Sequence, residues 1–143
     1  MLNTTIQDIM TTELITARCD ETVTRVAEIF KEYSFHHIPI INADNCIEGI
    51  VSRTDFERIK NGTTHFRIQN IEEHNATLFQ TLLARDIMTK GVVHLNPSDP
   101  IKAAYQVFKK NIFRALPVIS KGKLVGMVTP LDILDFFFNK NNN

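Results

Sequence analysis

Two segments of the chain carry apolar residues at the spacing of an amphipathic helix. Positions i, i+3, i+4 and i+7 are apolar in both, namely Val23, Val26, Ala27 and Phe30 in the first and Ile101, Ala104, Tyr105 and Phe108 in the second. This spacing places the apolar side chains on one face of a helix. Asp20 and Glu21 precede the first helix, and Ser98-Asp99-Pro100 offers the second a hydroxyl cap, so both helices are expected to begin near these residues.

Each helix is followed by two short apolar runs separated by a polar turn, which predicts a β-hairpin. The runs are residues 38–41 and 47–51 in the first case and residues 116–119 and 124–128 in the second. A proline lies early in each hairpin and belongs at a strand start or on an edge, because it has no N–H to donate. A second helix is expected near Arg53 and near Pro130, and brief extended stretches are expected at residues 14–16 and 92–95.

The two sets of elements are copies of one another. Asp8-Ile9-Met10-Thr11 returns as Asp86-Ile87-Met88-Thr89, 78 residues further along, and the proline strand returns at the same offset. Each copy reads strand, helix, strand, strand, helix, which predicts a mixed α+β (α/β) fold. The copies are expected at residues 1–60 and 84–138, with a linker at 61–83, in which residues 71–83 are candidates for a connecting helix, and a disordered tail at 139–143. One copy alone is too small to bury a good core, so we expect function where the copies meet.

Composition and charge narrow the classes of protein. The chain has 143 residues, of which 43% are hydrophobic, as expected for one soluble globular unit. The 16 basic and 16 acidic residues balance, which argues against binding to a nucleic-acid backbone or to an anionic membrane surface. Neither a membrane-spanning stretch nor a signal segment is evident, so a cytoplasmic location is expected. Cys19 and Cys46 are expected to be ordinary reduced thiols.

A small polar corner follows the last strand of each copy. Gly49 and Gly126 lie inside apolar strands, and three residues later a hydroxyl opens a helix in the motifs Ser52-x-x-Asp55 and Thr129-x-x-Asp132. Free N–H groups at a helix start favour an anion. One interpretation is a capping box that needs no ligand. The other is a nucleoside site, in which the carboxylate accepts hydrogen bonds from ribose hydroxyls and the helix end meets a phosphate.

These motifs together resemble the cystathionine-β-synthase domain (CBS domain) family, whose members usually occur as tandem pairs called Bateman modules. The resemblance rests on the Asp-Ile-Met-Thr starts, the x-Pro-hydrophobic strands and the Gly-hydrophobic-hydrophobic-Ser/Thr-x-x-Asp ends, and it covers residues 6–60 and 84–138. It implies two β-α-β-β-α repeats packed about a pseudo-twofold axis. It also implies clefts between the repeats that take adenine nucleotides, and frequent dimerisation into a flat disc.

The resemblance also implies roles for particular residues. Asp55 and Asp132 would bind ribose, Ser52 and Thr129 ribose or phosphate, Thr16 and His94 would border adenine, and His36, His37 and Arg114 would meet phosphates. Simple packing or surface roles for the histidines, and a solvated or salt-bridged Arg114, are the alternatives. Adjacent strand residues point to opposite faces, so a metal site at the histidine pair is not expected. Because Ala115 replaces His37 and Pro97 replaces Cys19 in the second copy, we expect the two sites to differ.

No catalytic motif is evident in the sequence, which predicts a protein that is not an enzyme and has no catalytic cofactor. The leading hypothesis is a regulatory module that senses energy state through AMP, ADP or ATP, with the Mg²⁺ requirement left open. Ligand binding would rearrange the repeats of a homodimer and influence an unidentified regulated protein. The alternative is a dimerising structural or interaction module with no functional ligand. The apolar end Phe136-Phe137-Phe138 is expected to bury two rings in the core or at a dimer seam.

Overall fold

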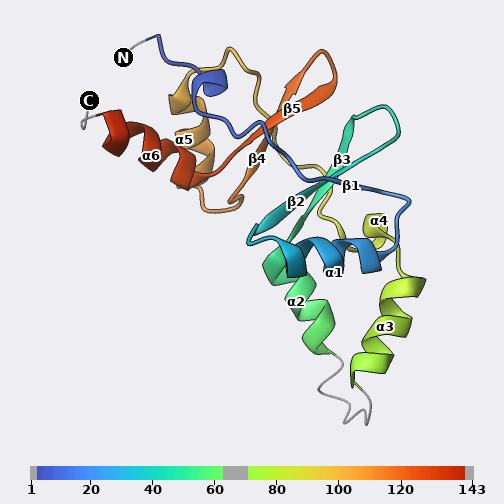
Figure 1. Cartoon of the computed structure of the whole chain (residues 1–143). Coiled ribbons are helices and arrows are strands. Elements are labelled where there is room, and N and C mark those ends of the chain that lie inside the picture. The colour runs from blue at the N-terminus through green and yellow to red at the C-terminus, as the bar shows by residue number, and fades with distance from the viewer. Residues whose placement is uncertain (1–2, 63–70, 141–143) are drawn as a thin grey trace. The chain divides into compact units, whose positions relative to one another are not determined.

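The computed structural model describes residues 3–62 and 71–140 (Figure 1). The chain forms two compact units, which we call the central unit, Ile15–Gly91, and the terminal unit, Met1–Leu14 together with Val92–Asn143. The chain passes from the terminal to the central unit after Leu14 and returns after Gly91. Each unit therefore contains the opening segment of one repeat and the hairpin and helices of the other.

The central unit is built on a three-stranded sheet in the order β1-β2-β3. Its strands are β1 (Ala17–Arg18), β2 (His37–Ile41) and β3 (Ile47–Ser52). Strand β1 runs parallel to β2, and β2 and β3 form the predicted antiparallel hairpin, with an irregularity in register between Ile40 and Ile41. The hairpin prediction is confirmed.

The described part of the central unit also contains four helices: α1 (Val23–Glu32), α2 (Arg53–Gly62), α3 (Ile71–Thr81) and α4 (Ala84–Ile87). Three residues of the predicted α1 stripe, Val23, Val26 and Phe30, are buried and Ala27 is partly buried. The ring of Phe56 on α2 packs 5.3 Å from Phe30 and 5.4 Å from Phe79, measured between ring centroids. Helix α3, which the sequence marked as a candidate, thereby joins the core of this unit. Residues 63–70 of the predicted linker lie outside the described residues.

The terminal unit has the same plan. It contains the short 3-10 helix η1 (Ile6–Asp8), α5 (Ile101–Lys109), the hairpin β4 (Leu116–Ser120) and β5 (Lys123–Val128), and α6 (Pro130–Lys140). Its core consists of Ile6, Leu95, Ala104, Leu116, Val118 and Val128. Helix α6 ends at Lys140, so the tail prediction is wrong for residues 139 and 140, and residues 141–143 lie outside the described part of the chain. The expectation that the Phe136-Phe137-Phe138 end buries two rings in the core is wrong for the unit itself, because Phe137 and Phe138 remain exposed and Phe136 is only half-buried.

The first strand of each copy differs from its prediction. Strand β1 begins one residue after the expected stretch 14–16, and the stretch 92–95 forms only one parallel bridge, between Leu95 and Val118. Proline explains the short pairing, because Pro39 has no N–H for a third strand and β1 meets β2 only at Ile40 and Ile41.

The predicted hydroxyl cap of the second helix is also wrong. Helix α5 begins at Ile101, with Pro100 in the N-cap position and no side-chain cap. The acidic residue instead closes the turn before the helix, since the Asp99 carboxylate accepts the N–H of Asn96 at 2.8 Å. In the first copy the Glu21 carboxylate accepts the N–H of Arg18 at 2.8 Å in the same way. Both copies therefore use a carboxylate to satisfy a backbone donor in the turn before the helix, although the sequence suggested a hydroxyl for the second copy.

The opening motif of each repeat is hydrogen-bonded to the hairpin of the other. The Thr11 N–H donates to the Met127 carbonyl at 2.8 Å, and the Thr11 carbonyl accepts the Met127 N–H at 3.0 Å. Thr89 and Ile50 exchange the equivalent pair of hydrogen bonds at 2.8 and 3.1 Å. The exchange of segments between repeats is thus carried by the same backbone contacts in both units.

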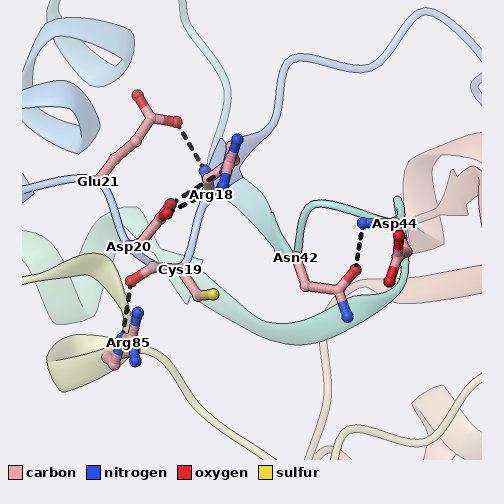
Figure 2. A network of polar contacts seen from close by, with 7 residues as sticks. All are labelled: Arg18, Cys19, Asp20, Glu21, Asn42, Asp44 and Arg85. Carbon is pink, nitrogen blue, oxygen red and sulfur yellow. Dashed lines mark hydrogen bonds and ion pairs between the residues drawn. The ribbon is translucent and has the colours of Figure 1, made fainter.

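A polar turn at the start of α1 accepts the second opening segment (Figure 2). Both the backbone N–H and the Nε–H of Arg85, on α4, donate to the carbonyl of Cys19 at 3.2 Å. The neighbouring guanidinium of Arg18 holds the Asp20 carboxylate with two hydrogen bonds of 3.1 and 2.9 Å. Cys19 therefore contributes its backbone carbonyl to this contact. Proline also has a backbone carbonyl, and that of Pro97, at the matching position of the second copy, accepts the N–H of Gln7 at 3.0 Å.

Alanine at the two strand glycines should reveal how close the exchanged segments lie. A Cβ atom on Gly49 would come within 2.7 Å of the Thr89 carbonyl oxygen, which is fixed backbone, whereas one on Gly126 would first meet the movable Sδ of Met10 at 2.6 Å. We expect Gly49→Ala to lower the free energy of unfolding by about 1–3 kcal/mol and Gly126→Ala by less. Urea denaturation of the two variants tests this order, and a larger loss for Gly126→Ala would contradict it.

Candidate functional site

Five of the predicted site residues lie near the same end of the strands in the central unit. His37 at the start of β2 lies opposite Ser52 at the end of β3 in the strand register. Thr16 directly precedes β1. Because β1 runs parallel to β2, Thr16 lies toward the same end of the strands as His37. His36 precedes β2 and is exposed, and Asp55 lies in the first turn of α2. Residues that are up to 39 positions apart in the sequence, from Thr16 to Asp55, therefore lie toward the same end of the strands.

The hydroxyl of Ser52 caps α2, but the carboxylate of Asp55 does not complete the capping box. The Asp55 N–H donates to Ser52 Oγ at 3.0 Å. The Asp55 carboxylate instead forms an ion pair of 3.2 Å with Arg58, whose side chain is 74% exposed. An ion pair this exposed contributes little stability, so the Asp55 carboxylate can exchange it for another donor at small cost.

Arg53 fixes the loop that carries His36. Its backbone N–H donates to the His36 carbonyl at 2.7 Å, and its guanidinium donates to the carbonyls of Phe35 and Tyr33, each at 2.8 Å. The guanidinium also lies 4.7 Å from the ring centroid of Phe30. With its donors used in this way, Arg53 acts as a clamp between the first turn of α2 and the segment before β2. The corresponding residue of the second copy is Pro130, which has no side-chain donor.

The terminal unit builds its corner differently. Thr129 N–H donates to Asp132 Oδ2 at 2.8 Å, and Asp132 N–H returns to Thr129 Oγ1 at 3.4 Å, which is a reciprocal capping box. The hydroxyl of Thr11, from the opening segment of the first repeat, donates to Asp132 Oδ1 at 3.4 Å. Thr11 was not among the residues predicted for the site. Its repetition at Thr89 was visible in the sequence, but the partner hairpin was not.

The other two predicted residues of the terminal unit flank the same hairpin and are exposed. His94 directly precedes Leu95, which forms the bridge to β4, and Arg114 lies two residues before β4. The place taken by His37 in the central unit is taken by Ala115, which is buried. The two corners therefore differ in polarity at this position, and the expectation that the two sites differ in ligand binding stays a prediction.

Two further observations concern possible metal sites and membrane-spanning helices. Within residues 3–62 and 71–140, no three His, Cys, Asp or Glu side chains come together as a metal ion would require. In the same part of the chain, no helix combines the length and the apolar character needed to cross a membrane.

The repeats define the class of protein. The family model of the CBS domain matches residues 6–61 and 84–139, which agrees with the two sequence copies. The chain belongs to the CBS domain family and contains two CBS repeats.

Known proteins resemble the chain over most of its length. Homoserine O-acetyltransferase of Methanococcoides burtonii is 26% identical over 134 residues, which is 93% of this chain and 24% of that protein. The chain thus spans about a quarter of the enzyme's length. The structure of CBSX2 in complex with AMP has a TM-score of 0.77 at 21% identity and covers 96% of this chain and 98% of that one. The CBS domain pair of protein MJ0100, in complex with 5′-methylthioadenosine and S-adenosyl-L-methionine, has a TM-score of 0.71 at 23% identity, with coverage of 96% and 98%.

The Arg53 clamp should contribute measurably to stability. Arg53→Met removes two charge-assisted hydrogen bonds and the contact with Phe30, and we expect it to lower the free energy of unfolding by about 1–3 kcal/mol. Arg58→Met, the matched control on the same helix, loses only an exposed ion pair and should cost about 0–1 kcal/mol. Urea denaturation measures both, and equal losses would show that the clamp is energetically unimportant.

The two signature carboxylates should also differ in their structural contribution. Asp132→Ala removes an acceptor for the Thr129 N–H and for the Thr11 hydroxyl, so we expect it to cost about 1–2 kcal/mol. Asp55→Ala removes an exposed ion pair and should cost about 0–1 kcal/mol. Thermal or urea unfolding without ligand checks the difference, with Asp135→Ala, an exposed carboxylate further along α6, as the control. A greater loss for Asp55→Ala would contradict the assigned contacts.

Proposed function

We propose that the chain is a regulatory module that binds an adenine nucleotide, AMP, ADP or ATP. The observation that carries this proposal is the duplicated corner: in both repeats a hydroxyl and a carboxylate stand at the start of the helix that follows a glycine-containing strand. A carboxylate at that place can accept hydrogen bonds from ribose hydroxyls, and the helix start offers N–H groups and a favourable dipole to a phosphate. CBSX2 was crystallised with AMP and MJ0100 with two adenosine derivatives, which supports this ligand class.

In this proposal the predicted site residues contact different parts of the nucleotide, according to their side chains. The ribose is held by Asp55 or Asp132, and Ser52 or Thr129 reaches ribose or phosphate. Thr16 and His94 border the adenine, and the basic side chains of His36, His37 and Arg114 meet the phosphates. The exposure of His36 and Arg114 supports a role with an anionic ligand, since both basic groups are accessible at the start of a hairpin.

The proposed mechanism is linkage and involves no catalysis. A nucleotide that binds one arrangement of the repeats more tightly shifts the population toward that arrangement, and a regulated protein that prefers it then responds to energy state. We further propose that the module is a homodimer and acts in the cytoplasm, where its two free cysteines remain reduced. Because the related acetyltransferases share only about a quarter of their length with the chain, their activity is not part of this proposal.

A second function is favoured by one observation. The Thr129–Asp132 pair satisfies its own capping box and also receives Thr11, all without a ligand. The duplicated corners could then serve stability alone, and the chain would be a dimerising interaction module with no functional ligand.

Thermal unfolding with millimolar AMP, ADP or ATP, each with and without Mg²⁺, tests the sensor. A nucleotide present at 100 times its dissociation constant should stabilise the fold by about 2.7 kcal/mol, which raises the midpoint by several degrees. We expect the rise to shrink in Asp55→Ala, in Asp132→Ala or in both. The shift for each variant is measured against its own midpoint without ligand, because Asp132→Ala lowers the baseline.

Matched variants separate binding from stability in this experiment. Glu57→Ala and Asp135→Ala remove carboxylates from the same two helices and should leave the nucleotide-dependent rise unchanged. If no adenine nucleotide moves the wild-type midpoint, the sensor proposal fails and the interaction module takes its place. GMP at the same concentrations controls for general effects of nucleotides.

A further inference from the structure

The outer face of helix α5 in the terminal unit is basic (Figure 1). Ala104 and Phe108 on its inner face pack in the core of the unit. Lys102, Tyr105 and Lys109, at positions i, i+3 and i+7, lie together on the other side and are exposed. The sequence placed Tyr105 on the apolar stripe, and that prediction is wrong for this residue, because its exposed fraction is 50%. The helix thus presents two lysines with a tyrosine between them.

The charge of this face is not balanced by ion pairs. Residues 100–131 contain six of the chain's 16 basic residues and none of its 16 acidic residues. In the part of the chain that the structure describes, no ion pair joins Lys102, Lys109 or Lys110 to a carboxylate. The neutral total of the sequence therefore conceals a local excess of positive charge, which a partner of opposite charge can neutralise.

The matching helix of the first copy lacks this face. At the offset of 78, the three positions of the α5 face correspond to Thr24, Ala27 and Lys31 of α1. The charges of α1 are also paired locally, since Arg25 contacts Glu21 at 3.9 Å and Glu28 at 3.7 Å. The inner positions of the two helices are apolar in both copies. The basic face is thus a feature of one repeat, and the fold itself does not require it.

The spacing of the two lysines matches that of a partner helix. Seven residues of a helix rise about 10 Å, so carboxylates seven residues apart on a second helix would have the same separation as Lys102 and Lys109. Between the lysines, Tyr105 offers an aromatic ring with a hydroxyl, and tyrosine is among the side chains that most often anchor protein interfaces. The lysines would then supply the polar rim around that anchor.

Two other anionic partners fit this face less well. A helix that binds a membrane surface inserts its apolar face, but the apolar face of α5 is buried in the core of its unit. Proteins that hold a nucleic-acid backbone often make roughly 6–10 phosphate contacts, whereas this face offers Lys102 and Lys109, with Lys110 at its edge. An acidic helix needs fewer positive charges and also uses the tyrosine.

We propose that the outer face of α5, formed by Lys102, Tyr105 and Lys109, docks an acidic helix of a partner protein. Carboxylates seven residues apart on that helix pair with the two lysines, and an apolar side chain between them covers Tyr105. The charges mainly favour rapid association and select against basic partners. The inference rests on the proposed function for the identity of the partner, because it supplies the surface on which the regulated protein binds.

Fluorescence anisotropy with a defined probe tests the docking face. The probe is a fluorescein-labelled, alanine-based helical peptide with Glu at positions i, i+7 and i+14 and Leu at i+4 and i+11, so that one side of it carries both. We expect the wild type to bind this peptide. Lys102→Gln combined with Lys109→Gln should bind it roughly 2- to 30-fold more weakly, because two exposed ion pairs are lost. A peptide of the same composition with its glutamates spread around the helix should bind the wild type more weakly.

Matched variants separate the α5 face from the net charge of the chain. Lys31→Gln combined with Lys90→Gln removes the same charge from the central unit and should leave the affinity unchanged. Lys102→Arg combined with Lys109→Arg keeps both charges and should bind like the wild type. All four lysines are exposed, so circular dichroism should show that every variant is folded.

The other anionic partners enter the same experiment as phosphatidylserine vesicles and duplex DNA. A wild type that does not bind the peptide, or equal affinities of the two glutamine variants, would overturn the proposal. Lysine-dependent binding to the vesicles or to DNA that is tighter than binding to the peptide would also overturn it. No nucleotide is present in these measurements, so their failure is distinct from a failure of the sensor proposal.

Discussion

The reciprocal hydrogen bonds between each opening motif and the opposite hairpin are the constraint on which both units depend. Thr11 pairs with Met127, and Thr89 pairs with Ile50, through backbone groups that would otherwise lack partners at a strand edge. The approach is so close that the facing strand position has room only for glycine, as the Thr89 carbonyl near Gly49 demonstrates. Because of this exchange, neither repeat completes its core from its own sequence, and the repeats interlock in the chain.

The exchange also reaches the candidate site. In the terminal unit it brings the Thr11 hydroxyl to Asp132, so a ligand that engaged this carboxylate would compete with a contact from the opening segment. Among the described residues of the central unit, the Asp55 carboxylate is held by an exposed arginine of its own helix, Arg58. The same signature motif therefore presents one carboxylate that is tied to the exchanged segment and another that is nearly independent of it. If both corners bind the proposed ligand, this difference would make their affinities unequal.

Local elements could be predicted from the sequence, whereas the exchange could not. The apolar period of Val23 to Phe30 and the polar turns of the hairpins depend on neighbouring residues, so α1 and the β2–β3 pair are found near their predicted places. The opening motifs are nearly identical in the two copies, and nothing in their sequence distinguishes a hairpin of the same copy from that of the other. For that reason Thr11 was missed as a neighbour of Asp132. The first strands were misplaced because only two residues, or one, form the pairing.

Divergence between the copies follows a pattern that the duplicated framework explains. Positions that face a core have kept their apolar character, since any change there would leave a cavity or a buried polar group. The outer positions are free of that constraint. On the central unit the outer positions of α2 are polar, Arg53 holds the loop before β2, and α3 contributes the Phe79 ring to the core. On the terminal unit Leu131, Leu134, Phe137 and Phe138 of α6 are exposed instead. Apolar side chains gain no stability while water covers them, so the stability of its own unit does not explain the apolar outer face of α6.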